Sequence, residues 1–222
     1  MGKKILIVVA HPDDEVLGIG GTILKHVSNN DKVSVLILGD GETSRKPDAD
    51  IQKRRSQAKR VAAELGIIEV ILENLPDNKF DSVPLLDITK KIEDVVNKIK
   101  PEIIYTHYPQ DLNIDHQLTF QATLTACRPQ PGFFVKKILA FETLSSTEWQ
   151  IKDSHHVFCP TEYVDISQNI ERKIEIMKIY EDELRKYPHP RSVEGIRILA
   201  RYRGMEVGCE YAEAYQVIRT LS

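Results

Sequence analysis

The feature that most constrains the fold is an alternation of short apolar runs with longer segments of helical periodicity through the first two thirds of the chain. Five apolar runs are predicted to be strands: Lys4–Ala10, Lys32–Leu38, Glu69–Leu72, Ile103–Thr106 and Lys137–Phe141. The segments between them are predicted to be helices: Val16–Val27, Ile51–Leu65, Leu85–Ile99 and Gln117–Ala126. This alternation is typical of a mainly parallel sheet with right-handed crossovers and helices on both faces. We therefore predict a Rossmann-like α/β fold.

The alternation stops at about residue 145, and the last third of the chain follows a different pattern. Its predicted elements are a short strand near Val157, a charged amphipathic helix at Ile170–Lys186, a second helix at Val193–Tyr202 and a final strand at Ala214–Arg219. The sequence Pro-His-Pro at residues 188–190 separates the two helices, because proline cannot continue a helix. No linker, internal repeat or low-complexity tract divides the chain, so we predict one domain over residues 1–222 with a C-terminal helical cap.

Composition argues against several classes of function. The 222 residues carry a formal net charge of -3, and basic and acidic residues are mixed without the basic stripe that a nucleic-acid partner requires. No apolar run is long enough to span a membrane. The three cysteines are far apart and odd in number, so they predict neither a disulfide framework nor a CxxC zinc clamp. We expect three buried thiols in a cytoplasmic protein, which could form a homo-oligomer.

Two loops rich in histidine and aspartate follow strands that we expect to be neighbours. In an open parallel sheet, ligands bind beyond the carboxyl ends of the strands, where strand order reverses. The first strand is followed by His-Pro-Asp-Asp-Glu at residues 11–15. If Ile103–Thr106 begins the other half of the sheet, the loop at residues 107–116 meets the first loop over the same crevice. This convergence is the main indication of a functional site in the sequence.

The residue types in these loops suit a catalytic zinc site. Two imidazoles and one carboxylate, with a fourth position left to water, are a common arrangement. His11 and Asp14 are three residues apart, so both side chains can face one point where a strand turns into a helix. Asp13 is then free to contact water. Zinc lowers the pKa of its water to about 7 and polarises a carbonyl. A neighbouring carboxylate can move the proton, so these parts suffice to hydrolyse an amide.

Each loop taken alone also has a structural explanation, because a histidine at a strand end is more often a buried structural residue and two aspartates before a helix are more often a cap. Two other classes of protein are alternatives: a receiver-like signalling module with an acidic pocket after its first strand, and a non-catalytic sugar-binding protein. The receiver interpretation leaves His11 and His116 unexplained, and the chain is far too long for it. The intact set of histidines and aspartates argues against loss of the chemistry.

Residues 10–22, Ala-His-Pro-Asp-Asp-Glu-Val-Leu-Gly-Ile-Gly-Gly-Thr, resemble the signature motif of the PIG-L/LmbE-like zinc de-N-acetylases. This family includes the enzyme of GPI-anchor synthesis and the deacetylases of mycothiol and bacillithiol synthesis. The resemblance extends to Tyr-Ala-Glu-Ala-Tyr at residues 211–215. It implies a zinc-dependent hydrolase that removes an N-acetyl group from a small, N-acetylglucosamine-containing substrate.

The resemblance also implies roles for individual residues. The residues at the zinc-ligand positions are His11, Asp14 and His116. Asp13 resembles the general base, and Asp115 resembles the acidic residue that orients a ligand histidine. Arg54 resembles an arginine that reaches the substrate, with its neighbour Arg55 as the alternative.

One position departs from the family pattern. Relatives often carry His-Pro-Asp-His where residues 113–116 of this chain read Asn-Ile-Asp-His, and the resemblance implies that the first histidine of that motif stabilises the oxyanion. Asn113 can donate a neutral hydrogen bond in its place, or a distant histidine can replace the missing one. His107 and His189 are the candidates, although the proline-rich sequence around His189 also explains it as a turn residue.

Substrate contacts are expected from polar loops over the same crevice. Asp40, Glu42 and Asp77 can accept hydrogen bonds from sugar hydroxyls, and residues 145–149, Ser-Ser-Thr-Glu-Trp, offer an aromatic platform. Arg54 and His189 complete the predicted substrate-binding set. The three acidic residues and the platform are equally well explained as solvated turns, because polar loop residues are common without a function.

Overall fold

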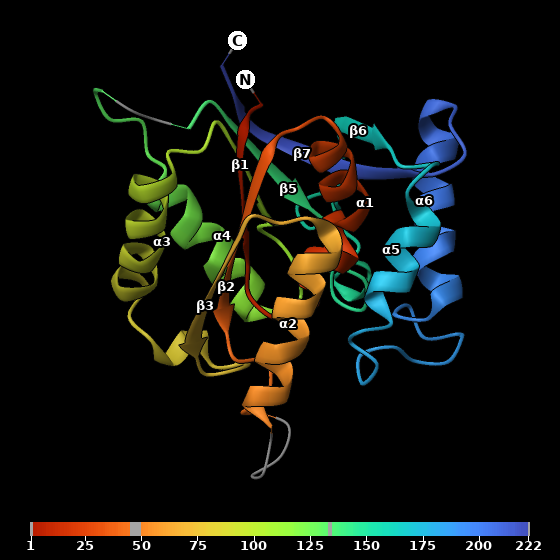
Figure 1. The fold of residues 1–222 in the computed structure, drawn as a ribbon, viewed down its shortest axis with the longest axis horizontal. Helices are drawn as coiled ribbons and strands as arrows, with labels where there is room; N and C mark the ends of the chain where they lie inside the picture. The colour runs from red at the N-terminus through yellow and green to blue at the C-terminus, as the bar shows by residue number, and fades with distance from the viewer. Residues whose placement is uncertain (1, 45–49, 133–134, 222) are drawn as a thin grey trace.

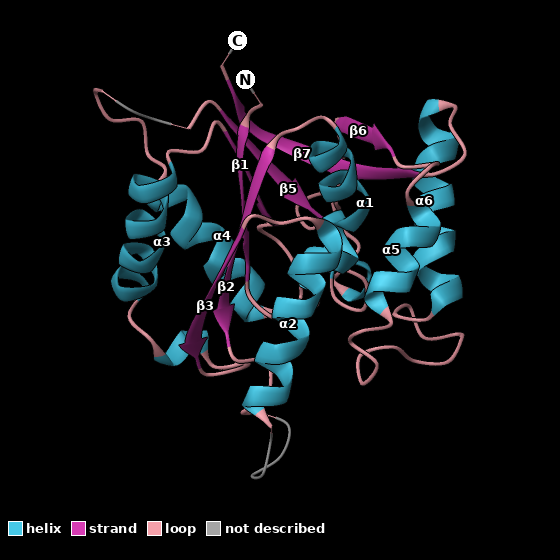
Figure 2. Cartoon of the chain, viewed as in Figure 1, coloured by secondary structure: helices cyan, strands magenta, loops and turns pink. Residues whose placement is uncertain are grey.

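The computed structural model describes residues 2–44, 50–132 and 135–221, and within these ranges seven strands form one sheet. The strands are β1 (Lys4–Val9), β2 (Lys32–Gly39), β3 (Glu69–Leu75), β4 (Ile103–His107), β5 (Lys137–Phe141), β6 (Glu162–Asp165) and β7 (Ala212–Thr220). The helices are α1 (Asp14–Ser28), α2 (Ile51–Leu65), α3 (Leu85–Ile99), α4 (Ile114–Ala126), α5 (Ile170–Met177) and α6 (Val193–Val207), with 3-10 turns η1 (Phe80–Ser82) and η2 (Thr147–Trp149). The sheet runs through the middle of the molecule with helices on both sides (Figures 1 and 2).

Strand order in the sheet is β3-β2-β1-β4-β5-β7-β6. The first five strands pair in parallel, and β7 runs antiparallel to both β5 and β6. This mainly parallel sheet with helices on both faces confirms the predicted α/β class. The order reverses at β1, which pairs with β2 on one side and with β4 on the other. The loops after β1 and β4 therefore meet over one crevice, as the sequence pattern predicts.

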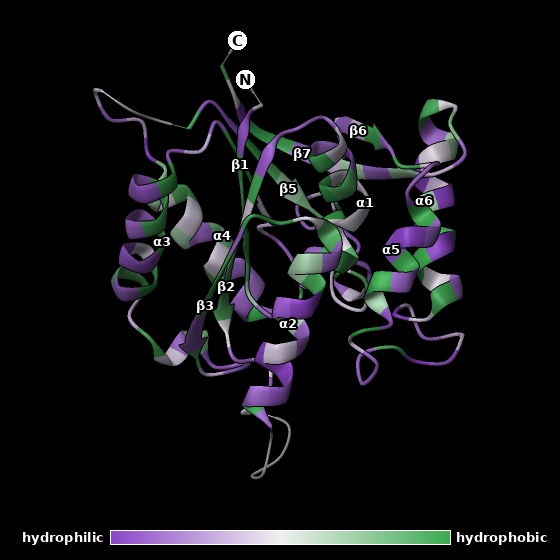
Figure 3. Ribbon diagram, viewed as in Figure 1, coloured by the Kyte–Doolittle hydropathy of each residue, from purple (hydrophilic) through white to green (hydrophobic). Residues whose placement is uncertain are grey.

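The core consists of two apolar layers, one on each face of the sheet. Alternate residues of β1 face opposite sides, because successive side chains of a strand point in opposite directions. Ile5 and Ile7 pack in the layer with α1, α2, α5 and α6, whereas Leu6 and Val8 pack in the layer with α3 and α4. In Figure 3, hydrophilic residues dominate the outer side of α3, as expected of a helix that covers a sheet.

Two predicted elements near the end of the chain need correction. No strand lies near Val157, which is exposed; the strand in this region is Glu162–Asp165, because that stretch finds hydrogen-bond partners on β7. The last helix does not end at Tyr202. It continues to Val207 and ends where Gly208 adopts a left-handed conformation with φ of 78°.

The helix predicted at Ile170–Lys186 is too long, since α5 ends at Met177. The chain then turns inward and buries Tyr180 and Glu183 completely. The Tyr180 hydroxyl donates a hydrogen bond to Glu15, beside the loop that follows β1, at 2.7 Å. Because the helix ends at Met177, the turns that follow bring Tyr180 and Glu183 to the crevice beside the loop after β1.

Among the described residues, no helix is long and apolar enough to cross a membrane. The expectation of three buried thiols holds only for Cys127. Cys159 is exposed and Cys209 is half-buried.

Glycines allow α1 to lie close to its neighbours. A Cβ on Gly18 would lie 2.2 Å from the Phe141 ring, and one on Gly21 would lie 2.7 Å from Ile166. These distances are too short for any side chain, so the glycines set how closely α1 approaches the end of β5 and the segment before α5.

Gly18→Ala should lower the free energy of unfolding, because the added methyl group would overlap the Phe141 ring and overpacking a core costs about 1–3 kcal/mol. Gly20→Ala is the matched control. Its added Cβ would lie 3.2 Å from Lys173 Cγ and 3.3 Å from Val16 Cγ1, contacts that a shift of a few tenths of an ångström relieves, and alanine favours a helix over glycine by about 1 kcal/mol. Urea unfolding of both variants measures the difference, and equal stability would contradict the packing argument.

Candidate metal and catalytic site

The loop after β1 is a tight turn held by local hydrogen bonds. Asp13 has a φ of 128°, a conformation that residues other than glycine rarely adopt. Its carbonyl accepts the N–H of Val16 at 3.0 Å, and its own N–H donates to the Glu15 side chain at 3.0 Å. Backbone strain of this kind costs about 1–3 kcal/mol and is concentrated at functional sites. The turn starts α1 at Asp14, whose side chain points back toward His11.

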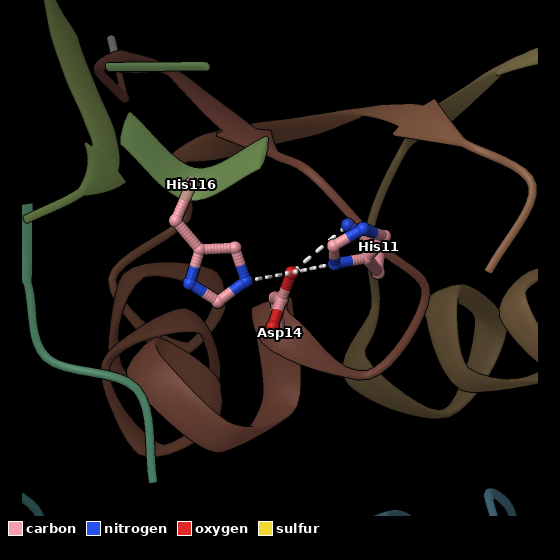
Figure 4. Close-up of side chains that lie close together, drawn as sticks. All are labelled: His11, Asp14 and His116. Carbon is pink, nitrogen blue, oxygen red and sulfur yellow. Dashed lines mark hydrogen bonds and ion pairs between the residues drawn. The ribbon is translucent and has the colours of Figure 1, made fainter. Parts of the chain in front are cut away.

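Three side chains converge beyond the ends of β1 and β4 (Figure 4). Asp14 Oδ2 lies 3.5 Å from His11 Nδ1 and 3.4 Å from His116 Nε2, and all three residues are buried. The same oxygen accepts the backbone N–H of His11 at 2.9 Å. The potential ligand atoms lie within 4.8 Å of one another, so one metal ion can contact all three. Two imidazole nitrogens and one carboxylate oxygen are a donor set that fits zinc.

A second group, formed by His11, Asp77 and Asp115, also meets this distance condition. Here both carboxylates face His11 Nε2, with Asp115 Oδ2 at 2.9 Å and Asp77 Oδ1 at 3.2 Å. Each carboxylate is engaged further, Asp115 by a backbone N–H and Asp77 by a hydroxyl. An Nε2–H donated to Asp115 leaves His11 Nδ1 facing Asp14. The first group is therefore the better metal candidate, and the second group orients its histidine.

Asp111 makes the corresponding contact with the other histidine, and the sequence analysis missed it. Its Oδ1 lies 3.3 Å from His116 Nδ1, although the two atoms do not form a hydrogen bond of good geometry. The Asp111 carboxylate is completely buried and accepts hydrogen bonds from the hydroxyls of Ser146 and Thr147. A second aspartate in the loop that carries His116 was the available signal.

His107 lies behind the site. It is completely buried and stacks on His116 with ring centroids 3.8 Å apart. Its Nε2 accepts the backbone N–H of Ala10 at 2.9 Å, so the ring proton of the neutral form is on Nδ1, 3.4 Å from the Thr143 hydroxyl. Burial lowers the pKa of His107 to about 4, which keeps the ring neutral near pH 7. His107 Nε2 also lies 3.4 Å from Asp14 Oδ2, so the ring contacts two of the candidate ligands, and its complete burial leaves it no access to a substrate.

The Asp13 carboxylate faces Arg191, which the sequence pattern did not single out. Arg191 Nη1 lies 3.2 Å from Asp13 Oδ2 and 3.0 Å from a Glu183 oxygen. Arg54 is 2% exposed and pairs with Glu183 and with Glu42, the latter at 2.7 Å. The two arginines thus share Glu183, but only Arg191 lines the cavity described below. The Pro-His-Pro-Arg sequence was the signal for it.

The buried charges shift one another's pKa values. Burial raises the pKa of Asp13 well above its usual range, neighbouring carboxylates add to the effect, and the two arginines oppose it. Burial also acts to raise the pKa of Asp14, but the adjacent imidazoles outweigh it and hold this pKa well below the usual range. For His116, burial acts to lower the pKa, but Asp14 and Asp111 raise it to about 9. The site therefore has a strong preference for positive charge at its centre.

Asn113 is the N-cap of α4. Its Oδ1 accepts the backbone N–H of Asp115 at 2.8 Å, and its Nδ2 donates to Asn78 Oδ1 at 3.2 Å. Within the described residues no acceptor takes the second amide hydrogen. Since Asn113 lines the cavity, its position is compatible with capping the helix and with donating to a bound ligand.

A cavity of about 200 Å³ opens onto the three converging side chains. Its lining residues are His11, Asp13, Asp14, Leu17, Asp77, Asn78, Asn113, His116, Thr143, Leu144, Ser145, Ser146 and Arg191. The structure thus brings together every predicted metal ligand with Asp13, Asn113 and Asp77. Asp115 lies just behind them, in contact with His11.

Four residues predicted to bind substrate do not line this cavity. Asp40 accepts two backbone N–H groups of its own loop, at 2.8 and 2.9 Å. Glu42 and Arg54 are bound to each other, which leaves both engaged in holding the loop after β2 against α2. His189 packs edge-on against the tryptophan of η2, with ring centroids 5.5 Å apart.

The chain matches the PIG-L family, described as GlcNAc-PI de-N-acetylase, over residues 6–127. This match covers more than half of the 222 residues and includes both loops of the site. The chain belongs to this family. The predicted family and the predicted class of enzyme, a hydrolytic deacetylase, are confirmed, and the receiver-like alternative is not supported.

Relatives and solved structures extend the comparison to nearly the whole chain. A diacetylchitobiose deacetylase from Thermococcus kodakarensis is 26% identical over 229 residues, covering 97% of this chain and 83% of that protein. The structure of N,N'-diacetylchitobiose deacetylase from Pyrococcus horikoshii has a TM-score of 0.77 at 20% identity, covering 97% and 84% of the two chains. The 4-carboxy-2-hydroxymuconate hydratase GalB from Pseudomonas putida has a TM-score of 0.76 at 21% identity, covering 99% and 98%. The fold alone therefore does not determine the reaction.

The stability of the metal-free protein should fall as pH rises from about 6.5 to 9, the range between the ordinary pKa of histidine and that of His116 in the fold. A group whose pKa is raised by folding stabilises the folded state fully below its unfolded pKa, and that contribution is lost as pH rises through its folded pKa. The difference is worth on the order of 3 kcal/mol. His11, whose pKa is also raised, acts in the same direction.

Urea unfolding of chelator-treated protein at several pH values measures this slope. His116→Gln should flatten it, whereas replacement of the exposed His155 by Gln should not. Zinc-loaded protein should lack the decline, because metal ligands bind in their deprotonated forms. A metal-free protein that gains stability across this range would contradict the electrostatic description.

Proposed function

We propose that this chain is a zinc-dependent hydrolase that removes the N-acetyl group of a small, N-acetylglucosamine-containing substrate. The convergence of His11 Nδ1, Asp14 Oδ2 and His116 Nε2 in a cavity carries the proposal. Membership of a de-N-acetylase family supports the reaction, and relatives named as diacetylchitobiose deacetylases support an N-acetylated sugar. A cytoplasmic location and a possible homo-oligomer stay predictions.

In this proposal, His11, Asp14 and His116 would hold the zinc ion, while Asp115 and Asp111 would keep the two imidazoles oriented. Zinc would supply a Lewis acid that polarises the acetamide carbonyl and lowers the pKa of water. Asp13 lines the cavity directly beside the ligand set. It accepts a proton from the attacking water and returns it to the leaving amine, as a general base that becomes a general acid. Arg191 fixes the orientation of the Asp13 carboxylate.

Asn113 is proposed to stabilise the oxyanion. Its second amide hydrogen is not used by Asn78, and it lines the cavity next to His116. A hydrogen bond to the carbonyl oxygen strengthens as that oxygen becomes charged, which lowers the barrier rather than only improving binding. His189 lies outside the lining, so Asn113 is the better candidate.

The cavity size favours recognition of the acetamido end of the substrate. About 200 Å³ is less than the roughly 300–1,000 Å³ typical of sites for drug-sized ligands, so the rest of the molecule stays near the rim. Asp77 is proposed to accept a hydrogen bond from a sugar hydroxyl inside the cavity. Arg54 and Glu42 would act indirectly by holding Glu183 and the loop after β2, and Asp40 by shaping that loop. His189 and the η2 tryptophan would contact the part outside.

Acetate release tests the proposed function. Protein purified without added metal should contain about one zinc ion per chain and release acetate from some members of a panel of N-acetylated sugars. Chelation should abolish the activity and added zinc should restore it. A transition metal far below one per chain, or no acetate from any member, would contradict the proposal.

The proposed base and ligands should fail in different ways. Asp13→Asn keeps the shape of the side chain but cannot accept the proton, so turnover should fall about 10²–10⁴-fold while the metal is retained. His116→Ala should lose metal and activity together. Elemental analysis and initial rates on the same samples make the comparison. If Asp13→Asn stripped the metal while Asp14→Asn kept it, the two aspartates would exchange roles.

Asn113→Asp separates the two functions of that residue. Aspartate caps a helix as well as asparagine does but has no amide donor, so turnover should fall about 10²–10³-fold with zinc content and stability nearly unchanged. Asn113→Ala should show the same loss of turnover and also lose about 1 kcal/mol of stability with the cap. Full activity of Asn113→Asp would make Asn113 a cap only, and loss of activity in His189→Gln would then identify the replacement.

A further inference from the structure

One buried ion pair contacts the backbone of the helix that carries Asp14. Lys173 of α5 and Glu213 of β7 are 2.7 Å apart, with side chains 5% and 4% exposed. Lys173 Nζ donates to the carbonyl of Leu17 at 2.8 Å. Glu213 accepts the N–H of Gly21 at 2.9 Å and that of Thr22 at 2.7 Å. The two charges thus meet backbone groups of opposite polarity, one helical turn apart.

These contacts lie at the hydrogen-bond ladder of α1. In an α-helix the carbonyl of one residue bonds to the N–H four positions later, and Leu17 and Gly21 are such a pair. Side chains that insert at the ladder are a recognised cause of a bend in a helix. The arrangement also has a direction, because an ammonium group can only donate and a carboxylate can only accept. The ion pair therefore specifies the position of this turn and does more than neutralise charge.

Glycines make the approach possible. A Cβ on Gly20 would lie 3.2 Å from Lys173 Cγ, so a side chain larger than alanine at this position would push the lysine away from the helix. The Gly21 carbonyl accepts a further hydrogen bond from Asn169, at 3.2 Å. The segment that begins α5 and the first residues of β7 therefore hold the middle of α1, beyond the turn that carries Asp13 and Asp14.

We propose that the Lys173–Glu213 pair is a positioning device for Asp13 and Asp14. The turn it holds starts four residues after Asp13, and Leu17 lines both the site cavity and a small interior cavity of about 20 Å³ beside the ion pair. His116 comes from the other half of the sheet, so the direction of α1 sets the distance from Asp14 to that histidine. This inference rests on the proposed metal site.

The chain offers a matched control. Arg203 of α6 and Glu142, at the end of β5, form a pair with two contacts of 2.7 Å, and their side chains are 10% and 14% exposed. This pair lines the same small cavity. Among the hydrogen bonds of the described residues, neither of its side chains contacts α1.

Zinc affinity, measured by competition with a chelator, tests the inference in wild type, Glu213→Gln and Glu142→Gln. Loss of groups that orient a metal site costs about 10–100-fold in affinity, and Glu213→Gln should weaken zinc binding by that factor. Glu142→Gln should stay close to wild type. Thermal unfolding of the metal-free proteins shows whether the two changes disturb the fold to a similar extent. Unchanged affinity in Glu213→Gln, or an equal loss in both variants, overturns the inference.

A charge-swapped variant, Lys173→Glu with Glu213→Lys, tests the direction of the contacts. It keeps a pair of opposite charges but turns a carboxylate toward the Leu17 carbonyl and an ammonium group toward two N–H donors. Its zinc affinity should remain low, and recovery to the wild-type value would overturn the inference. If the swapped protein does not fold, Glu213→Gln decides alone. Absence of zinc binding in wild type would instead reject the proposed function.

Discussion

Parallel pairing of β1 with β4 determines where the polar groups of this molecule can gather. Strand order reverses at β1, so the loops on the two strands leave the sheet in opposite directions and open a crevice between them. Residues more than 100 positions apart, such as His11 and Asp115, come within 2.9 Å because their strands are neighbours. The strained turn at Asp13 then directs α1 away from the crevice while leaving the Asp14 side chain inside it.

Burial of so many charges imposes a second constraint on the site. Asp111, Asp115 and Glu183 are completely buried, and each lies against an imidazole or a guanidinium group. Loss of one partner leaves an uncompensated buried charge, which costs about 3–5 kcal/mol. The residues behind the candidate ligands are therefore nearly as constrained as the ligands. The buried carboxylates Asp14 and Asp111 also raise the pKa of His116. A proton on this imidazole supplies part of the positive charge that a divalent cation would bring.

Sequence reasoning reached the part of the site that depends on local spacing. His11, Asp13 and Asp14 lie within four residues, and the strand–helix alternation was enough to place the loop of His116 opposite them. Arg191 was missed because its contact with Asp13 spans 178 positions and depends on turns that interrupt a helical pattern. Asp40 was predicted to bind substrate, but it does not line the cavity. It follows a strand as expected, but its side chain binds the backbone of its own loop, and residue spacing does not show which way a side chain points.

The residues inside and outside the family match have different physical roles. The family match at residues 6–127 contains every candidate metal ligand, whereas Lys173, Arg191 and Glu213 lie beyond it. Lys173 and Glu213 bind the backbone of α1. Arg191 contacts Asp13 and lines the cavity beside it. A deacetylase and a hydratase share this fold at 20% and 21% identity, so the sheet does not select the chemistry. Selection must lie in the side chains that face the crevice, and the segment between α5 and α6 adds Arg191 to a cavity whose candidate metal ligands all lie between residues 11 and 116.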